Sequence, residues 1–195
     1  EGFQSISRTG QRAIWFFGEN LYALEGGAQQ MREEDARAVE MALDRYGDAM
    51  YRLSISYLKS PPEAEDVVQE ALIRYMDSRP AFESEAHEKA WLLRVTANLC
   101  KNRLKSSWWQ KRSELSDELP ASPPNESGSE LWHAVNGLPP KYRAVIYLYY
   151  YEGYSTAEVA QLTQVREATV RSQLARARDS LKKRLKGGDG FEEYI

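Results

Sequence analysis

The chain has 195 residues, of which 42% are hydrophobic and 28% are charged, so it can bury either one large core or two small ones. Its formal net charge of −3 gives no overall sign of nucleic-acid binding. Cys100 is the single cysteine, which excludes an intramolecular disulfide and favours a reducing cytoplasm. The sequence has no metal-ligand spacing, phosphate-binding glycine loop or nucleophile motif. It therefore predicts no metal and no cofactor, and gives no indication of an enzyme.

Charged residues form blocks of opposite sign in the middle of the chain. Between Trp91 and Arg112 there are six lysines or arginines and no acid, and between Ser113 and Glu130 there are five acids and no base. Such blocks indicate segments that meet different partners. The acidic block is also rich in proline and serine, so we expect residues 113–129 to be a flexible linker between two domains.

The first domain is predicted over residues 31–112. The preceding residues 1–30 are punctuated by glycine, and their short apolar run fits neither a membrane span nor a signal peptide, so we expect a poorly ordered leader or upstream extension. Three helices are predicted after it, with a loop over 78–88: Arg32–Lys59 with a break near Gly47, Glu63–Asp77 and Lys89–Lys105.

The second domain is predicted over residues 130–186, followed by a tail at 187–195. Short helices are expected over 130–136 and 141–152, and the tyrosines at 149–151 are expected to pack the core of this domain.

The end of this domain has the pattern of a helix-turn-helix. A short helix is expected over Thr156–Leu162, a polar turn over 163–166 and a long helix over Glu167–Leu185. Apolar residues of the long helix recur every three or four positions, as one buried stripe requires: Val170, Leu174, Ala177, Leu181 and Leu185.

The other side of the long helix is basic. From Arg166 to Lys186 there are eight lysines or arginines and only two acids. A basic face alone is better explained by solvation of an ordinary helical hairpin. Here the short first helix, the turn and the basic second helix occur together, and this combination favours DNA binding in the major groove.

With both domains in view, the chain resembles a bacterial extracytoplasmic-function (ECF, group 4) sigma factor of the sigma-70 family, a specificity subunit of RNA polymerase. Residues 64–76, AEDVVQEALIRYM, resemble the helix that docks on the clamp coiled coil of the polymerase β′ subunit. Residues 89–105, KAWLLRVTANLCKNRLK, resemble the helix that melts and reads the −10 element. The segments LPPKYRAVIYLYYYEGYSTAEVAQL and TVRSQLARARDSLKKRL resemble the domain that reads the −35 element.

The resemblance implies three sets of site residues, each of which can also be read as ordinary solvated helix surface. The set for core polymerase is Asp66, Gln69 and Glu70. The set for the −10 element is Phe82, Arg94, Asn98, Lys101, Asn102 and Lys105. The set for the −35 element is Arg166, Thr169, Arg171, Ser172, Gln173 and Arg176. The loop at 79–86 is expected to lie beside Asn98 and form a pocket for unpaired bases.

Three positions depart from the family pattern. Gln164 occupies a turn position that is usually glycine, Arg166 one that is usually small or polar, and Gln173 one that is often basic. These departures put the turn geometry and the preferred DNA sequence in doubt, but not the class.

We therefore expect an all-α protein of two small helical domains joined by a flexible acidic linker, the C-terminal one a helix-turn-helix. The resemblance implies a cytoplasmic protein without catalysis or small-molecule substrate, monomeric when free, whose partners are core RNA polymerase (β′ clamp coiled coil and β flap), promoter DNA and an anti-sigma factor. The alternative is a conventional helix-turn-helix regulator, which would bind duplex operators as a dimer. An RNA-binding or adaptor protein would need stacking aromatics on an exposed sheet or repeat, and we find neither.

Overall fold

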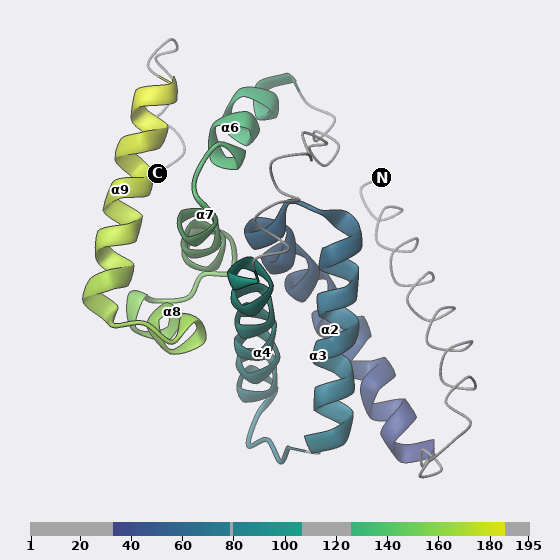
Figure 1. Ribbon diagram of the computed structural model, residues 1–195. Coiled ribbons are helices and arrows are strands. Elements are labelled where there is room, and N and C mark those ends of the chain that lie inside the picture. Colours follow the sequence, from purple (N-terminus) through teal and green to yellow (C-terminus); the bar gives the residue numbers. More distant parts are fainter. Residues whose placement is uncertain (1–32, 79, 107–125, 186–195) are drawn as a thin grey trace.

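The structure, a computed structural model, describes residues 33–78, 80–106 and 126–185, and every regular element in those ranges is a helix. The first helices are α2 (Glu33–Leu58), α3 (Pro61–Ser78) and α4 (Glu85–Lys105). The later ones are α6 (Glu126–Asn136), α7 (Pro140–Ile146), the π-helical turn η1 (Tyr147–Tyr151), α8 (Thr156–Thr163) and α9 (Glu167–Leu185) (Figure 1). The predicted all-α class is confirmed.

Helix α2 runs without interruption through Gly47, where the sequence predicted a break. Glycine inside a helix costs about 1 kcal/mol relative to alanine. The prediction was wrong because the flanking side chains of Tyr46, Met50 and Leu53 are buried in the core, and their burial outweighs that local cost.

Helix α4 begins at Glu85, four residues before the predicted start at Lys89. The side chain of Ser84 caps the helix by accepting a hydrogen bond from the backbone nitrogen of His87 at 3.1 Å. Acidic residues in the first turn, among them Glu88, are favourable at this end of the helix dipole. The loop predicted over 78–88 is therefore shorter than expected.

The tyrosine run of the C-terminal half is mostly exposed, which corrects the prediction that it packs the core. Tyr147 and Leu148 are buried, whereas Tyr149, Tyr150 and Tyr151 are 37%, 40% and 61% exposed. The reason is geometric, because a helix can direct only part of five consecutive side chains inward. The π-helical turn η1 determines which of these side chains face the core.

The predicted helix-turn-helix is present as α8, a short turn and α9. Ser155 and Glu158 form a capping box at the start of α8. Gln164 ends α8 in the left-handed conformation, with φ 50° and ψ 45°, in which glycine is favoured. The apolar stripe predicted for α9 faces the core, with its last member half-buried: Val170, Leu174, Ala177, Leu181 and Leu185.

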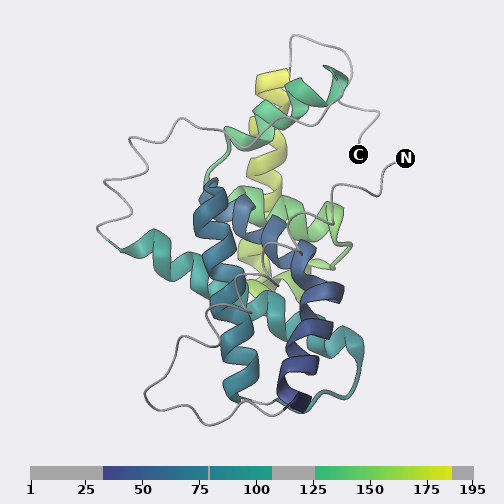
Figure 2. The same cartoon turned by 90° about the vertical axis from the view of Figure 1, so that its right-hand side faces the viewer.

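The two halves of the chain share one core. We call α2–α4 the N-terminal unit and α6–α9 with η1 the C-terminal unit. One cluster of buried side chains extends from Leu53 and Leu92 in the N-terminal unit to Val145 and Leu148 in the C-terminal unit. Helix α7 packs on α2 and α8 packs on α4 (Figures 1 and 2), while a smaller cluster holds α6 against α9. The sequence pattern predicted two domains but not this apolar contact between them, which we call the unit interface.

Several predicted segments lie wholly or partly outside the described residues. Helix α6 begins at Glu126, so residues 126–129, predicted as linker, belong to a helix. The leader at 1–30, most of the linker and the tail at 187–195 lie outside the described ranges.

Candidate polymerase and nucleic-acid interfaces

The acidic side of α3 is bound by an arginine of α4. Arg103 Nη1 lies 2.5 Å from Glu63 Oε2 and 3.5 Å from Asp66 Oδ2, and Arg103 Nη2 lies 3.7 Å from Glu70 Oε2. The Asp66 side chain stays 60% exposed, while Glu70 also pairs with Arg74 at 2.7 Å. The set predicted for polymerase binding thus combines two partly neutralised acids with a half-buried amide: Asp66, Glu70 and Gln69.

One side of α4 carries most of the residues predicted for the −10 element. Their spacing places them in one stripe without an acid: Arg94, Asn98, Lys101, Asn102 and Lys105. Lys101 is half-buried, and its Nζ donates a hydrogen bond of 2.8 Å to the carbonyl of Thr163, the last residue of α8. Burial, together with the nearby charge of Lys105, lowers the pKa of Lys101. The C-terminal unit therefore covers the middle of this stripe.

Phe82, the remaining −10 residue, lies before α4 in an aromatic cluster that the sequence analysis did not identify. Its ring stacks on Tyr75 with centroids 5.9 Å apart and meets His87 and Trp91 edge-on at 5.4 and 6.0 Å. The Tyr75 hydroxyl donates to Glu88 at 2.6 Å, which fixes one wall of the cluster.

The predicted closeness of this loop to Asn98 is not observed. Asn98 lies 13 residues after Glu85, the first residue of α4. At about 1.5 Å per residue the two positions are roughly 20 Å apart along the helix axis, and even Trp91, on which Phe82 packs, lies about 10 Å before Asn98. The prediction was wrong because it started the helix at Lys89 and so shortened this separation.

The side of α9 opposite the core is open to solvent. Thr169, Ser172 and Arg176 are exposed and lie on this side by helical spacing, opposite the buried Val170 and Leu174. The predicted −35 residues are thus exposed except for the last, which is half-buried: Arg166, Thr169, Arg171, Ser172, Arg176 and Gln173.

Arg171 lies on the flank of α9 and is bound within its own unit. Its Nη2 donates to Glu167 Oε1 at 2.6 Å, and the Thr156 hydroxyl donates to the same oxygen at 2.6 Å. These hydrogen bonds, from Thr156 and then Arg171, lower the pKa of Glu167. Part of the charge of Arg171 is therefore neutralised locally.

A groove of about 330 Å³ opens where the two units meet. Lys101 and Lys105 of α4 line it together with Gln173 of α9. The structure thus brings members of the −10 and −35 sets to the same place.

The unit interface is held by a buried arginine that the sequence analysis did not single out. Arg143 of α7 is 4% exposed, and it donates from Nε to the carbonyl of Ser56 at 2.7 Å, from Nη2 to that of Tyr57 at 2.9 Å and from Nη1 to that of Leu138. Ser56 and Tyr57 lie in the last turn of α2, whose carbonyls lack partners within the helix and form the negative end of its dipole. Burial lowers the pKa of Arg143 to about 10, so it stays charged at neutral pH. An arginine inside an apolar run was the only sequence signal for it.

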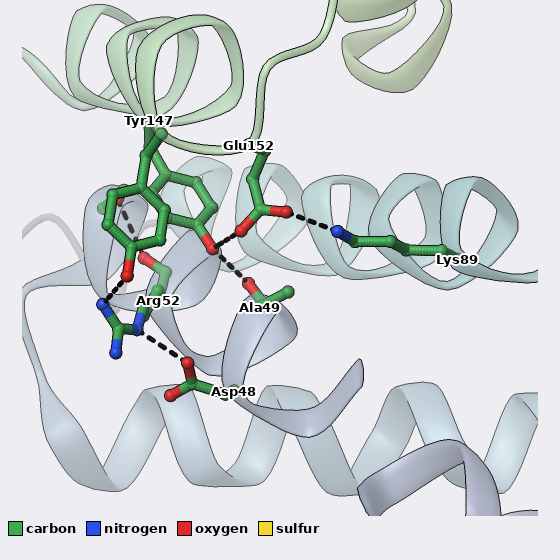
Figure 3. A network of polar contacts seen from close by, with 8 residues as sticks. Asp48, Ala49, Arg52, Lys89, Tyr147 and Glu152 are labelled. Carbon is green, nitrogen blue, oxygen red and sulfur yellow. Dashed lines mark hydrogen bonds and ion pairs between the residues drawn. The ribbon is translucent and has the colours of Figure 1, made fainter. Parts of the chain in front are cut away.

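A second polar network crosses the interface nearby (Figure 3). Lys89 Nζ of α4 lies 2.7 Å from Glu152 Oε2, and the Tyr147 hydroxyl donates to the other carboxylate oxygen while lying 3.2 Å from the carbonyl of Ala49. The Glu152 side chain is only 8% exposed, so its charge depends on these partners.

Arg52 of α2 lies at the exposed edge of this network. It pairs with Asp48 at 2.9 Å and donates to the hydroxyl of Tyr151, with its guanidinium carbon 5.0 Å from the centre of that ring. Because its side chain is 44% exposed, this contact is weaker than the buried one at Glu152.

The described residues hold no group of three or more histidines, cysteines or acids that could bind a metal ion. Cys100 is buried, and burial raises the pKa of its thiol to about 12, which makes it a poor nucleophile. In the part of the chain that the structure describes, no helix combines the length and the apolar character needed to cross a bilayer.

Comparisons with known proteins agree with this architecture. The sigma-70 region 2 family matches residues 42–110, and the family of sigma-70, region 4, matches residues 129–181. The RNA polymerase sigma-E factor of Streptomyces coelicolor is 30% identical over 151 residues, which are 73% of this chain and 82% of that protein. The ECF RNA polymerase sigma factor SigM of Mycobacterium tuberculosis is 27% identical over 172 residues, 82% of this chain and 88% of that one.

A solved structure shows the same fold. The sigma factor RpoE of Bartonella quintana, in complex with the anti-sigma factor NepR, aligns with a TM-score of 0.62 and 24% identity over 77% of this chain and 98% of its own. A conventional regulator is not favoured, because the region 2 family accounts for most of the N-terminal unit. The chain belongs to the extracytoplasmic-function sigma factors of the sigma-70 family, and its function is that of an RNA polymerase sigma factor.

Proposed function

We propose that the two units divide promoter recognition between them. Residues 31–112 bind core polymerase and the −10 element, 113–129 connect the units, and 130–186 bind the −35 element. The observation that carries the proposal is the acid-free polar stripe on α4, from Arg94 to Lys105, since a single strand needs cations and hydrogen-bond donors along one continuous surface.

Core polymerase docks on α3 through Asp66, Gln69 and Glu70, which offer acceptors to basic residues of the β′ clamp coiled coil. Arg103 already contacts both acids, so a polymerase cation must share or displace it. Asp66 is the more favourable point of entry because 60% of its side chain is exposed and its contact with Arg103 is long.

The −10 element is opened along α4. Arg94 and Lys105 are exposed and meet phosphates, while Asn98 and Asn102 are placed to donate to bases. Phe82 and its aromatic neighbours pack on the first half of α4, where Trp91 lies seven residues, or about 10 Å along the helix axis, before Asn98, and they hold a base at that end of the strand.

The −35 element is read by the open side of α9. Thr169, Ser172 and Arg176 face the major groove, where an arginine can bind two acceptors of guanine and contribute about 1–3 kcal/mol of discrimination. Arg166 at the start of α9 and Arg171 on its flank meet phosphates. Gln173 reaches DNA only after it leaves the groove between the units.

We further infer that the chain acts in the cytoplasm, is monomeric when free and leaves catalysis to the polymerase, whose β flap contacts the C-terminal unit. An anti-sigma factor is inferred as its regulator, since the Bartonella relative of the same fold is bound to one.

The test is co-elution with bacterial core polymerase in size-exclusion chromatography. Wild type should form a complex that Asp66→Arg/Gln69→Ala abolishes. Glu65→Arg is the matched control, since this neighbouring acid is exposed, undergoes the same charge change and lies about 100° further around α3. Failure to bind polymerase, with tight dimeric binding to duplex DNA instead, would contradict the proposal.

A further inference from the structure

We propose that Arg103 of α4 is a positioning residue for polymerase docking: its guanidinium is anchored on Glu63 and fixes the carboxylate of Asp66 on the face that α3 presents to core polymerase. The inference rests on the proposed assignment of Asp66, Gln69 and Glu70 to polymerase binding. The docking face is then built by two helices, whereas the sequence pattern placed it on α3 alone.

Arg103 is fixed by one close and shielded ion pair. Its Nη1 lies 2.5 Å from Glu63 Oε2, and the two side chains are only 26% and 13% exposed. Burial lowers the pKa of Arg103, but the hydrogen bond to Glu63 outweighs burial and raises that pKa overall. An ion pair shielded in this way is screened less by salt than an exposed one. Because Glu63 is outside the set predicted to contact polymerase, this pair can persist when polymerase docks.

The same guanidinium also reaches two acids of the predicted polymerase set. Its Nη1 lies 3.5 Å from Asp66 Oδ2, and its Nη2 lies 3.7 Å from Glu70 Oε2. Glu70 has a closer cation on its own helix, since Arg74 pairs with it at 2.7 Å. The contribution of Arg103 to the docking face therefore falls mainly on Asp66.

Asp66 benefits from a cation at this place for two reasons. Glu63, Asp66 and Glu70 lie on one side of α3 by helical spacing, and carboxylates three or four residues apart repel one another. The Asp66 side chain is also 60% exposed, so a partner that binds it must otherwise order it at a cost in entropy. Since a carboxylate accepts through two oxygens, Asp66 can keep Arg103 on Oδ2 while Oδ1 accepts from a basic residue of the polymerase.

Arg103 is itself a cation, so positioning and simple charge competition predict opposite results. If Arg103 only repels the basic partner, its removal tightens polymerase binding. If it positions Asp66, its removal weakens polymerase binding although the face becomes more negative. A change that leaves the net charge unaltered separates the two effects.

The main variant is Glu63→Gln/Arg103→Gln, which replaces the anchoring ion pair by two amides and keeps the net charge. It should weaken binding of the full chain to immobilised core polymerase about threefold or more, measured as Kd at one fixed salt concentration. Arg45→Gln/Glu85→Gln is the matched control, because it makes the same change in a 2.9 Å ion pair that joins α2 to α4. Glu85 lies 18 residues, or roughly 27 Å along the axis of α4, from Arg103. The control should change Kd less than about 1.5-fold.

A second variant separates positioning from a purely structural role. Arg103→Lys keeps a positive charge for Glu63, but an ammonium group lacks the planar fork that spans Glu63 and Asp66 together. We expect its unfolding midpoint in urea to match that of wild type, while its Kd for core polymerase rises about twofold or more. A residue that only stabilises the fold would leave the Kd of this variant unchanged.

A double-mutant cycle shows whether Arg103 acts through Asp66. In the Asp66→Asn background, Glu63→Gln/Arg103→Gln should have no further effect on Kd. The inference is overturned by unchanged or tighter polymerase binding in Glu63→Gln/Arg103→Gln, by an equal loss in the control, or by a loss that persists in the Asp66→Asn background. If Asp66→Arg/Gln69→Ala binds polymerase as wild type does, the proposed function fails and the inference fails with it. If that variant loses polymerase while Glu63→Gln/Arg103→Gln does not, only the inference fails.

Discussion

The two helix faces that we assign to promoter DNA differ in how far the rest of the chain buries them. On α4, Lys101 is half-buried and bonded to the carbonyl of Thr163. On α9, Thr169, Ser172 and Arg176 are exposed on the side away from the core. The face that we assign to duplex DNA is thus exposed, whereas Lys101, in the middle of the face that we assign to single-stranded DNA, is half-buried.

This difference concerns how readily each face can be reached in the packed chain. Duplex DNA is present before melting, so an open α9 can search for it at once. An exposed −10 stripe would instead bind any single-stranded nucleic acid, since contacts to phosphates and stacked bases are largely independent of sequence.

The largest effect on this comparison is expected from Arg143→Ala. The change leaves carbonyls at the end of α2 and at Leu138 without their charged donor, and it should lower the free energy of unfolding by about 3 kcal/mol. Urea unfolding followed by circular dichroism measures this loss, with Arg45→Ala as an exposed control that should cost at most about 1 kcal/mol. Equal losses in the two variants would show that the unit interface contributes little to the free energy of unfolding.

The open face is tested by comparing two arginines of α9. Arg176 is exposed on the outer side and has no carboxylate pair within the described residues, whereas Arg171 is held by Glu167 at 2.6 Å. Arg176→Ala should therefore weaken binding to a −35 duplex about tenfold, and Arg171→Ala only a few-fold. Fluorescence anisotropy with a duplex selected from a random library measures both. A larger loss of binding in Arg171→Ala than in Arg176→Ala would place Arg171, not Arg176, at the bases.

The elements of these two faces could be predicted from the sequence because their signals are local. The stripe from Val170 to Leu181 and the turn before Glu167 appear as spacing and polarity within one segment, and the structure has both. The signal for the early start of α4 at Glu85, the capping residue Ser84, was also local, but it was missed because this serine lies in a polar stretch that resembles a loop.

The unit interface could not be predicted in this way, because its contacts join residues far apart in the chain. Arg143 bonds to Ser56 and Tyr57 across 87 and 86 residues, and Lys101 bonds to Thr163 across 62. Helical periodicity shows that a side chain is buried but does not identify the helix against which it packs. The site residues were therefore predicted as sets, while the contact that half-buries Lys101 became visible only in three dimensions.

A smaller effect is expected at the turn after Thr163, the residue whose carbonyl accepts the hydrogen bond from Lys101. Gln164 follows Thr163 and adopts the left-handed conformation, which strains a residue with a Cβ atom. Gln164→Gly should raise the free energy of unfolding by about 1 kcal/mol, since relief of strain exceeds the added freedom of the unfolded chain. Gln161→Gly, one turn earlier in α8, is the matched control and should lower stability by about the same amount. Thermal unfolding separates the two, and a loss of stability in both would show that the turn is not strained.

The smallest effect concerns the other end of α8, the helix that covers α4. Hydrogen bonds from Ser155 lower the pKa of Glu158, so the ionised carboxylate stabilises the fold. This contribution is fully present above the pKa of Glu158 in the unfolded chain and is lost as the pH falls through the lower pKa of the folded chain. Ser155→Ala should therefore reduce stability by about 0.5–1 kcal/mol near pH 7, and its difference from wild type should shrink as the pH approaches about 3. Glu158→Gln keeps the serine cap without the ionisable group, so its stability should vary less with pH than that of wild type. Thermal unfolding across this pH range measures both. A Ser155→Ala deficit that does not change with pH would assign the cap to the serine hydroxyl alone and would show that the Glu158 carboxylate does not stabilise the start of α8.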